Sequence, residues 1–282
     1  MLRTMRNLLR WGDVPSDDEA AVTLAEVLAN DWLELWYQPK VELRSKRLAG
    51  AEALARARHP ERGVLSPAAF LPNATEADLL ALTERVIRTA LRDWDDFDYY
   101  DMPIMIAVNT PVSALTKLPI AEIIRERRPK AAHWPGLILE VTEDEAIDDV
   151  PFLTEVAAAV QACHCKLALD DFGAGYSSLA RLKQLPFSEL KIDRSYVTNC
   201  HADRVNAGLC EVIVELGQRF GLKTVAEGIE TVHEYHKLQG LGCDIGQGYL
   251  FSRPLSKDEF IAAAYRRLVT HGPITDERRA SA

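Results

Sequence analysis

The chain has 282 residues, with 33 lysines and arginines against 42 acidic residues, which gives a formal net charge of −9 at pH 7. Hydrophobic residues make up 48% and charged residues 27%, a balance typical of folded globular proteins and not of disordered or collagen-like chains. The acidic balance disfavours binding to long nucleic acid, but it is compatible with a small phosphate ligand held through metal ions.

Two further features concern the cellular compartment of the protein. No apolar run approaches the roughly 20 residues that cross a bilayer. The five cysteines, an odd number, favour a reducing environment over a disulfide framework. We therefore expect a cytoplasmic protein.

Residues 1–30 differ from the rest of the chain. Residues 2–11 form a short basic amphipathic stretch of leucines, methionine and arginines, and turn-forming residues follow it. We expect an N-terminal extension that is helical or loose, with a weak contact to a membrane or a protein partner as one use for it. The polar residues 271–282 predict a frayed tail, which leaves one domain over residues 31–270.

Between these ends, short apolar and β-branched runs alternate with helical patterns. Helices are expected from Ser66 to Trp94 and over residues 155–162, 206–219, 231–238 and 256–268. Only the first two strands are joined by a short link, over residues 44–47, which predicts a hairpin and one antiparallel strand. The predicted strands cover residues 36–43, 48–54, 104–108, 137–141, 166–170, 189–192, 223–226 and 248–251.

This order of elements predicts an α/β fold. Eight strands with helical crossovers over about 240 residues fit a TIM-type (βα)8 barrel with one antiparallel strand. A doubly wound open sheet is the alternative, but no glycine-rich dinucleotide fingerprint follows the first strand.

Seven of the predicted strands place a carboxylate, amide or ammonium group inside or at the end of an apolar run. Such groups are costly to bury unpaired, so they must meet one another, a metal or a ligand. In a barrel, C-terminal strand ends converge on one mouth, where barrel enzymes carry their chemistry. A single acid in a strand is more often a paired structural residue. Polar groups at corresponding places in seven strands are not expected by chance. These residues are Glu52, Asn109, Glu140, the pair Asp170 and Asp171, Lys191, Glu227 and Gln247.

The chemistry of this set indicates a hard divalent cation. Oxygen ligands select Mg²⁺ or Mn²⁺, and these strand ends offer no histidine and cysteine set suited to zinc. Asp170 and Asp171 end one strand, where both can reach metal and one can bridge two ions, the usual clamp for phosphoester displacement. Lys191 would add positive charge beside the attacking water. The following loop, with Gly173 and Gly175, is expected to be a mobile active-site loop.

The ordered combination of motifs resembles the EAL-domain phosphodiesterases that hydrolyse cyclic di-GMP. The resemblance covers about residues 31–268, and the signature triplet alone would mean little. The motifs are Tyr37-Gln38-Pro39, Glu52-Ala53-Leu54 with Arg56, Val108-Asn109, Leu139-Glu140-Val141-Thr142-Glu143, the run from Leu169 to Ser178, Leu190-Lys191-Ile192-Asp193, Ala226-Glu227-Gly228-Ile229-Glu230-Thr231, Gln247-Gly248-Tyr249 and Arg253-Pro254.

The resemblance implies two ions, Mg²⁺ or Mn²⁺, in each active site. It implies ligation of one ion by Glu52, Asn109, Glu140 and Asp170, and of the other by Asp170, Asp171 and Glu227. Glu52, Lys191 and Gln247 are the implied catalytic residues, with Lys191 at the nucleophilic water and Gln247 beside that water or the substrate phosphate. The implied substrate contacts are Gln38, Arg56 and Asp193. Glu143 and Glu230 are the residues implied to hold the active-site loop and one of the metal ligands. The implied loop residues are Gly173, Gly175, Ser177 and Ser178.

The implied reaction opens cyclic di-GMP to linear pGpG, as an activated water attacks phosphorus and a ribose 3′ oxygen leaves. A homodimer is the implied assembly. The chain departs from the family pattern at Ala57, where a bulky residue is usual, and at Thr110-Pro111 after Asn109. Both departures touch the pocket wall and remove no ligand, so activity is still expected.

Two other hypotheses remain open. A module of the same fold could bind cyclic di-GMP or a protein partner without cleaving it. A different metal-dependent barrel enzyme could use Lys191 as a base with a single metal and a carboxylate substrate. The adjacent aspartates and the separate Glu227 favour two metals over this last hypothesis.

Overall fold

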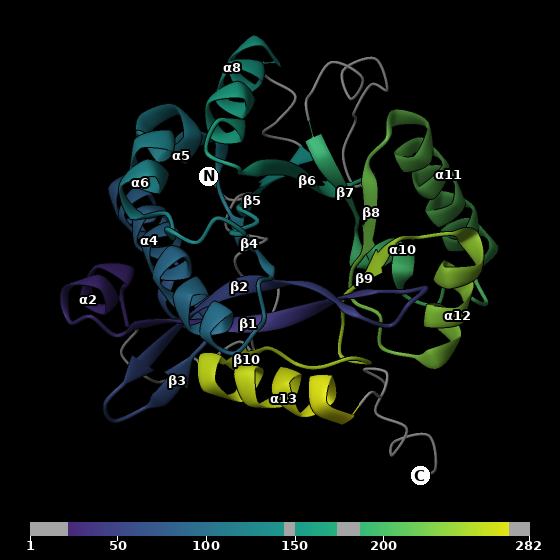
Figure 1. Cartoon of the computed structure of the whole chain (residues 1–282), viewed down its shortest axis with the longest axis horizontal. Helices are drawn as coiled ribbons and strands as arrows, with labels where there is room; N and C mark the ends of the chain where they lie inside the picture. The colour runs from purple at the N-terminus through teal and green to yellow at the C-terminus, as the bar shows by residue number, and fades with distance from the viewer. Residues whose placement is uncertain (1–21, 144–149, 174–186, 271–282) are drawn as a thin grey trace.

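The computed structural model describes residues 22–143, 150–173 and 187–270 (Figure 1). Its strands are β1 (Leu33–Glu42), β2 (Leu48–His59), β3 (Gly63–Leu65), β4 (Met105–Asn109), β5 (Leu137–Thr142), β6 (Lys166–Phe172), β7 (Phe187–Ile192), β8 (Lys223–Ala226), β9 (Ile245–Gly246) and β10 (Leu255–Ser256). Its helices are α2 (Leu24–Ala29), α3 (Pro67–Phe70), α4 (Glu76–Tyr99), α5 (Val112–Lys117), α6 (Ile120–Arg127), α8 (Val150–Gln161), α10 (Arg194–Val197), α11 (Arg204–Phe220), α12 (Val232–Leu241) and α13 (Lys257–Thr270).

Eight of the strands close into a barrel in the order β1, β2, β4, β5, β6, β7, β8 and β9, and β1 pairs back onto β9. β1 is antiparallel to both of its barrel neighbours, whereas the other neighbouring pairs around the barrel are parallel. The predicted TIM-type α/β barrel with one antiparallel strand is therefore confirmed.

Helices surround the barrel (Figure 1). α4, α5, α6 and α8 lie on one side, α11 and α12 lie on the opposite side, and α13 packs beside β1 and β10. α4 illustrates how the sequence builds this layer. It begins at a capping box between Thr75 and Asp78, and its buried Ala90, Trp94 and Phe97 recur at helical spacing to cover the barrel wall.

The barrel interior is closed below by a small apolar cluster. Ala107, Ile138 and Ala168 are buried together, with Met105 packed against them. Each of the three lies two positions before a polar residue that the sequence analysis placed at the mouth. Because side chains two apart on a strand share a face, this cluster forms the floor under the polar layer.

Some predicted boundaries were wrong. Residues 248–251 form a turn instead of a strand, and the last barrel strand is the two-residue β9. A Cβ on Gly248 would lie 2.2 Å from the Ile229 carbonyl oxygen, so a residue with a side chain could not follow this path. The helix expected from Ser66 is two helices, because Thr75 caps a new one. The short elements α2, α5, α6, α10, β3 and β10 were not predicted.

The packed unit begins earlier than residue 31. Thr23 and Glu26 form a capping box at the start of α2. Leu24 and Val27 of this helix are 1% and 0% exposed and belong to the main core. The basic residues 2–11, the tail 271–282 and loop residues Gly175, Ser177 and Ser178 lie outside the described residues. Within the described ranges, no helix combines the length and the apolar character needed to cross a bilayer.

Candidate active site

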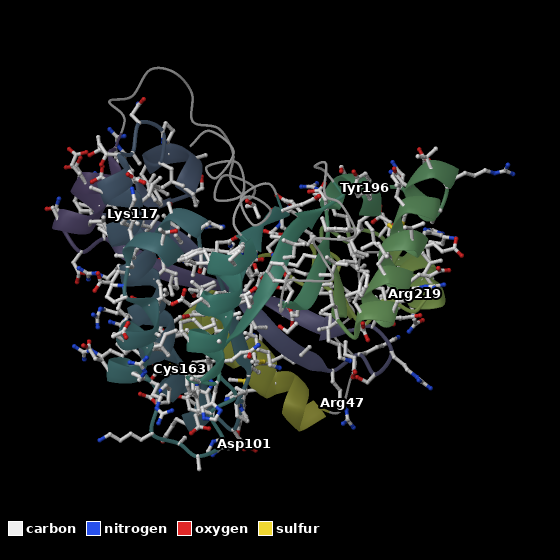
Figure 2. The ribbon with its side chains drawn as sticks, turned by 90° about the horizontal axis from the view of Figure 1, so that it is seen from above. Arg47, Asp101, Lys117, Cys163, Tyr196 and Arg219 are labelled. Atoms are coloured by element: carbon white, nitrogen blue, oxygen red, sulfur yellow. The ribbon has the colours of Figure 1, made fainter. Side chains whose placement is uncertain are left out.

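The polar strand-end residues meet at one end of the barrel. Figure 2 shows Lys117 and Tyr196, which follow β4 and β7, toward one end, and Asp101 and Cys163, which precede β4 and β6, toward the other. Because β2 and β4 to β9 all run toward the first end, their C-terminal residues gather there. We call this end the mouth.

Lys191 is the centre of the polar cluster at the mouth. Its Nζ lies 2.6 Å from Glu140 Oε2, 2.6 Å from Glu227 Oε1 and 3.3 Å from Asp170 Oδ1. The Lys191 side chain is 1% exposed, and the three carboxylates are at most 5% exposed. Three strands therefore deliver acids to one buried ammonium group.

This crowding of acids determines which groups hold protons. Burial alone would lower the pKa of Lys191, but Asp170, Glu140 and Glu227 outweigh it and hold that pKa well above its ordinary value. Burial raises the pKa of Glu140 to about 8, against the opposing effect of Lys191. Lys191 is thus an ammonium group in this arrangement, and further positive charge would stabilise the ionised acids.

Asp170 and Asp171 face the same site because the strand pattern breaks between them. Asp171 has a φ of 59°, and its N–H donates to Asp170 Oδ1 at 2.9 Å. One carboxylate oxygen from each of Asp170, Asp171 and Glu227 lies within 4.8 Å of the other two. In a regular strand the two aspartates would point to opposite faces. The geometry expected for a shared cation site is therefore present.

Two amides hold Glu52. Asn109 Nδ2 donates to Glu52 Oε1 at 2.7 Å, and Gln247 Nε2 donates to Glu52 Oε2 at 2.6 Å. Gln247 Nε2 also contacts Gln38 Oε1 at 2.9 Å, and Gln38 donates to the Ser252 carbonyl at 3.0 Å. This network connects β1, β2 and β4 to the chain after β9.

The network leaves one buried acceptor. Gln247 is 0% exposed, and within the described part of the chain its Oε1 has no hydrogen-bond partner. An unsatisfied buried acceptor costs about 1–3 kcal/mol, so such atoms often face a ligand or bound water. An oxygen-rich donor set beside such an acceptor fits hard divalent cations and the water molecules that they carry.

The other two expected substrate contacts lie farther along β2 and after β7. Arg56 is 6% exposed, donates through Nη1 to the Ala55 carbonyl at 2.7 Å, and stacks 5.9 Å from the Trp36 ring centroid. Asp193 caps α10 by accepting the Ser195 N–H at 2.7 Å. Asp193 therefore has a structural role in addition to any contact with substrate.

The loop that follows the aspartates is held at its first residue. Gly173, at a φ of 96°, donates its N–H to Glu143 Oε2 at 2.7 Å. Its carbonyl accepts a hydrogen bond from the Tyr196 hydroxyl. Glu143 thus contacts the loop, as the sequence predicts, through a backbone N–H. Glu230 instead holds Arg194, at 2.6 Å.

Sequence reasoning missed Lys40, Glu189 and Tyr196. Lys40 is 2% exposed and extends into the barrel from β1, and its Nζ lies 2.6 Å from Glu189 Oε2. The available signal was a lysine two positions after Gln38, because alternate residues of a strand share a face. Tyr196 carried no signal, since its partner is a backbone carbonyl.

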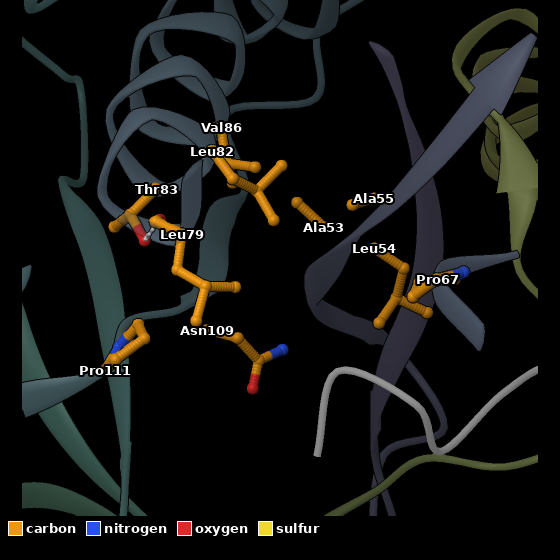
Figure 3. Close-up of a pocket in the computed structure, with 10 residues that line it drawn as sticks. All are labelled: Ala53, Leu54, Ala55, Pro67, Leu79, Leu82, Thr83, Val86, Asn109 and Pro111. Carbon is orange, nitrogen blue, oxygen red and sulfur yellow. Dashed lines mark hydrogen bonds between the residues drawn. The ribbon is translucent and has the colours of Figure 1, made fainter. Parts of the chain in front are cut away.

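A separate pocket lies between α4 and β2 (Figure 3). Leu79, Leu82 and Val86 line one side and Ala53 the other, and Asn109 borders it. The cavity measures about 20 Å³, room for about one water molecule, and it is mostly apolar. It is therefore too small for a nucleotide.

Comparisons with known proteins identify the family of the chain. The family model described as "EAL domain" matches residues 21–254. The chain is 37% identical over 245 residues to the bifunctional diguanylate cyclase/cyclic di-GMP phosphodiesterase MucR of Pseudomonas aeruginosa, covering 85% of this chain and 36% of MucR. It is 36% identical over 260 residues to the cyclic di-GMP phosphodiesterase RocR of the same organism, covering 89% of this chain and 66% of RocR. The chain spans 31–66% of the length of the first four curated relatives that it matches.

Solved structures show the same fold. The MucR phosphodiesterase in complex with cyclic di-GMP superposes with a TM-score of 0.75 at 37% identity, covering 84% of this chain and 97% of that one. A manganese and cyclic di-GMP complex of BlrP1 from Klebsiella pneumoniae superposes with a TM-score of 0.68 at 26% identity, covering 80% of this chain and 57% of that one.

Proposed function

The chain belongs to the EAL-domain family, and from this premise we propose that it is a metal-dependent phosphodiesterase that hydrolyses cyclic di-GMP to linear pGpG. The observation that carries the proposal is the convergence of acids from β5, β6 and the residue after β8 on Lys191, beside the Glu52 network. This arrangement is costly without a cation or phosphate to use it. The names of the relatives MucR and RocR support the same substrate.

The donor set defines the proposed cation sites. Bound there, Mg²⁺ or Mn²⁺ supplies Lewis-acid activation and neutralises charge on the transferred phosphoryl group. The residues that would hold one ion are Glu52, Asn109, Glu140 and Asp170, and those that would hold the other are Asp170, Asp171 and Glu227. Two ions suit this donor set because Glu52 lies on β2 and Glu227 follows β8, so their oxygens reach the site from different strands.

The chain's own residues provide orientation and charge. Gln247 Oε1, the buried acceptor, accepts a hydrogen bond from the attacking water and orients it toward phosphorus. Lys191 stays protonated and stabilises the negative charge that develops on the phosphoryl oxygens. Arg56 offers a charged fork to a second phosphate oxygen of the substrate. Gln38 fixes Gln247 in place.

The alternative with Lys191 as a base finds no support. A lysine base needs a depressed pKa, so that it can accept a proton near neutral pH. The surrounding carboxylates hold the pKa of Lys191 well above its ordinary value.

The direct test is incubation of the purified protein with cyclic di-GMP and Mg²⁺ or Mn²⁺, followed by chromatography of the products. We expect linear pGpG, and we expect none after chelation with EDTA or in the Asp170→Asn variant. Glu215→Gln is the matched control, since this exposed acid lies on α11 and, within the described residues, pairs only with Arg219. Binding of cyclic di-GMP by calorimetry without any turnover would favour the non-catalytic module instead.

A further inference from the structure

A second buried ion pair lies beneath the proposed metal site. Lys40 of β1 and Glu189 of β7 are 2% and 8% exposed, and their charged atoms are 2.6 Å apart. Glu189 lies two positions before Lys191 on the same strand and pairs in register with Ala168, so its side chain lies at the level of the apolar floor, one layer below the mouth. None of the motifs that define the active site includes Lys40 or Glu189.

Glu140 is held from two directions. Its Oε2 lies 2.6 Å from Lys191 Nζ at the mouth, and its Oε1 lies 3.5 Å from Lys40 Nζ below. The Glu140 side chain is 0% exposed, so both oxygens depend on protein partners. Lys191 has two other carboxylates to contact, but Lys40 has only Glu189 and Glu140 among the described ion pairs.

We propose that Lys40 is a positioning residue: it holds Glu140 Oε1 from inside the barrel, so that Oε2 is presented to a divalent cation at the mouth. Glu189 anchors the ammonium group and keeps Lys40 extended across the barrel. Contacts of this kind behind a metal ligand fix its orientation, and their loss costs about 10–100-fold in metal affinity. Lys40 touches neither the substrate nor the reacting atoms.

The single variant Lys40→Met is an unsafe test, because it leaves the buried Glu189 without its cation and threatens folding. The double variant Lys40→Met/Glu189→Leu removes both charges and fills the space with apolar side chains of similar size. Replacement of a buried pair in this way is often neutral for stability. The variant Lys40→Gln/Glu189→Gln supplies a neutral hydrogen-bonded pair and answers the same question if the first variant does not fold.

The measurement is Mn²⁺ affinity by calorimetry, together with melting temperature in EDTA. We expect the double variants to melt near the wild-type temperature and to bind Mn²⁺ at least about tenfold more weakly. The matched control Glu215→Gln removes an exposed acid of α11 outside the site and should bind Mn²⁺ within about twofold of wild type. Wild-type Mn²⁺ affinity in a folded double variant would overturn the inference and leave the pair a purely structural one.

This inference rests on the proposed role of Glu140 as a metal ligand. The variant Glu140→Gln separates the two. If it binds Mn²⁺ as wild type does, the metal-site proposal fails; if it loses Mn²⁺ while the double variants keep it, only the role of Lys40 fails. Neither result depends on whether cyclic di-GMP is cleaved.

Discussion

Glu143 accepts a hydrogen bond at 2.7 Å from the backbone N–H of Gly173, a residue 30 positions away that begins the loop after the aspartate pair. The Gly173 carbonyl is held in turn by Tyr196. Both backbone groups of one glycine are therefore tied to side chains from other segments, two residues after Asp171.

The first prediction concerns Glu143. Glu143→Ala removes a bond to a charged acceptor, which is worth about 1.5–3 kcal/mol, and frees the backbone beside Asp171. We expect the Mg²⁺ concentration for half-maximal activity to rise about tenfold or more, with little change in melting temperature. Tyr196→Phe, which removes the other tie, should shift the same titration in the same direction. A Mg²⁺ titration identical to wild type would show that Glu143 is an ordinary paired acid.

The second prediction concerns Glu52. This carboxylate accepts from Asn109 and Gln247 and contributes little to folding beyond these bonds. Glu52→Ala should lower turnover by more than about a hundredfold. This exceeds the roughly 10–100-fold loss that follows removal of a residue supporting a metal ligand. The circular dichroism spectrum should stay unchanged. Ca²⁺ should support little turnover in wild type, because its longer and looser coordination misplaces the water. Near-normal hydrolysis by Glu52→Ala at saturating Mg²⁺ would contradict the ligand assignment.

The third prediction separates two roles of Lys191. Lys191→Ala leaves Glu140, Asp170 and Glu227 without their ammonium group, and breaking a buried pair in this way costs about 3–5 kcal/mol. The melting temperature in EDTA should fall by several degrees, and excess Mg²⁺ should restore it.

Turnover in the same variant should not recover. Removal of one preorganised charge from a reaction site costs about 10²–10³ in kcat, and added cations do not replace it. The check is kcat and KM measured at the Mg²⁺ concentration that restores the melting temperature. Full recovery of kcat there would show that Lys191 only neutralises the acids.

The fourth prediction concerns the cysteines. All five are free and buried, and burial raises the pKa of Cys165 and of Cys243 to about 12. A thiol reagent at pH 8 should therefore label none of them quickly in the native protein and five after denaturation. Cys200, whose pKa is lowered by a hydrogen bond with the Cys210 side chain, should be labelled first as urea is raised. Rapid native labelling of Cys165 would contradict its burial just before β6.

The sequence predicted most of the site because its chemistry lies at strand ends. Asn109 and Asp170 each stand two positions after a small floor residue, and barrel geometry brings such positions together. Short elements escaped prediction because so few residues carry no periodic signal. For example, α5 follows its N-cap Pro111 and spans only six residues, Val112–Lys117. Lys40 was missed for another reason, since a partner on β7 is invisible to local patterns.

The bond between Gln247 and Gln38 joins residues 209 positions apart, because the last barrel strand closes against the first. During synthesis on the ribosome, the acids of the early strands therefore emerge well before the residues that complete the site. A nascent chain that lacks Gln247 has no partner for Glu52 Oε2 and no closed wall. Completion of the barrel wall and of the hydrogen bonds around Glu52 should thus be a late, all-or-none event in translation.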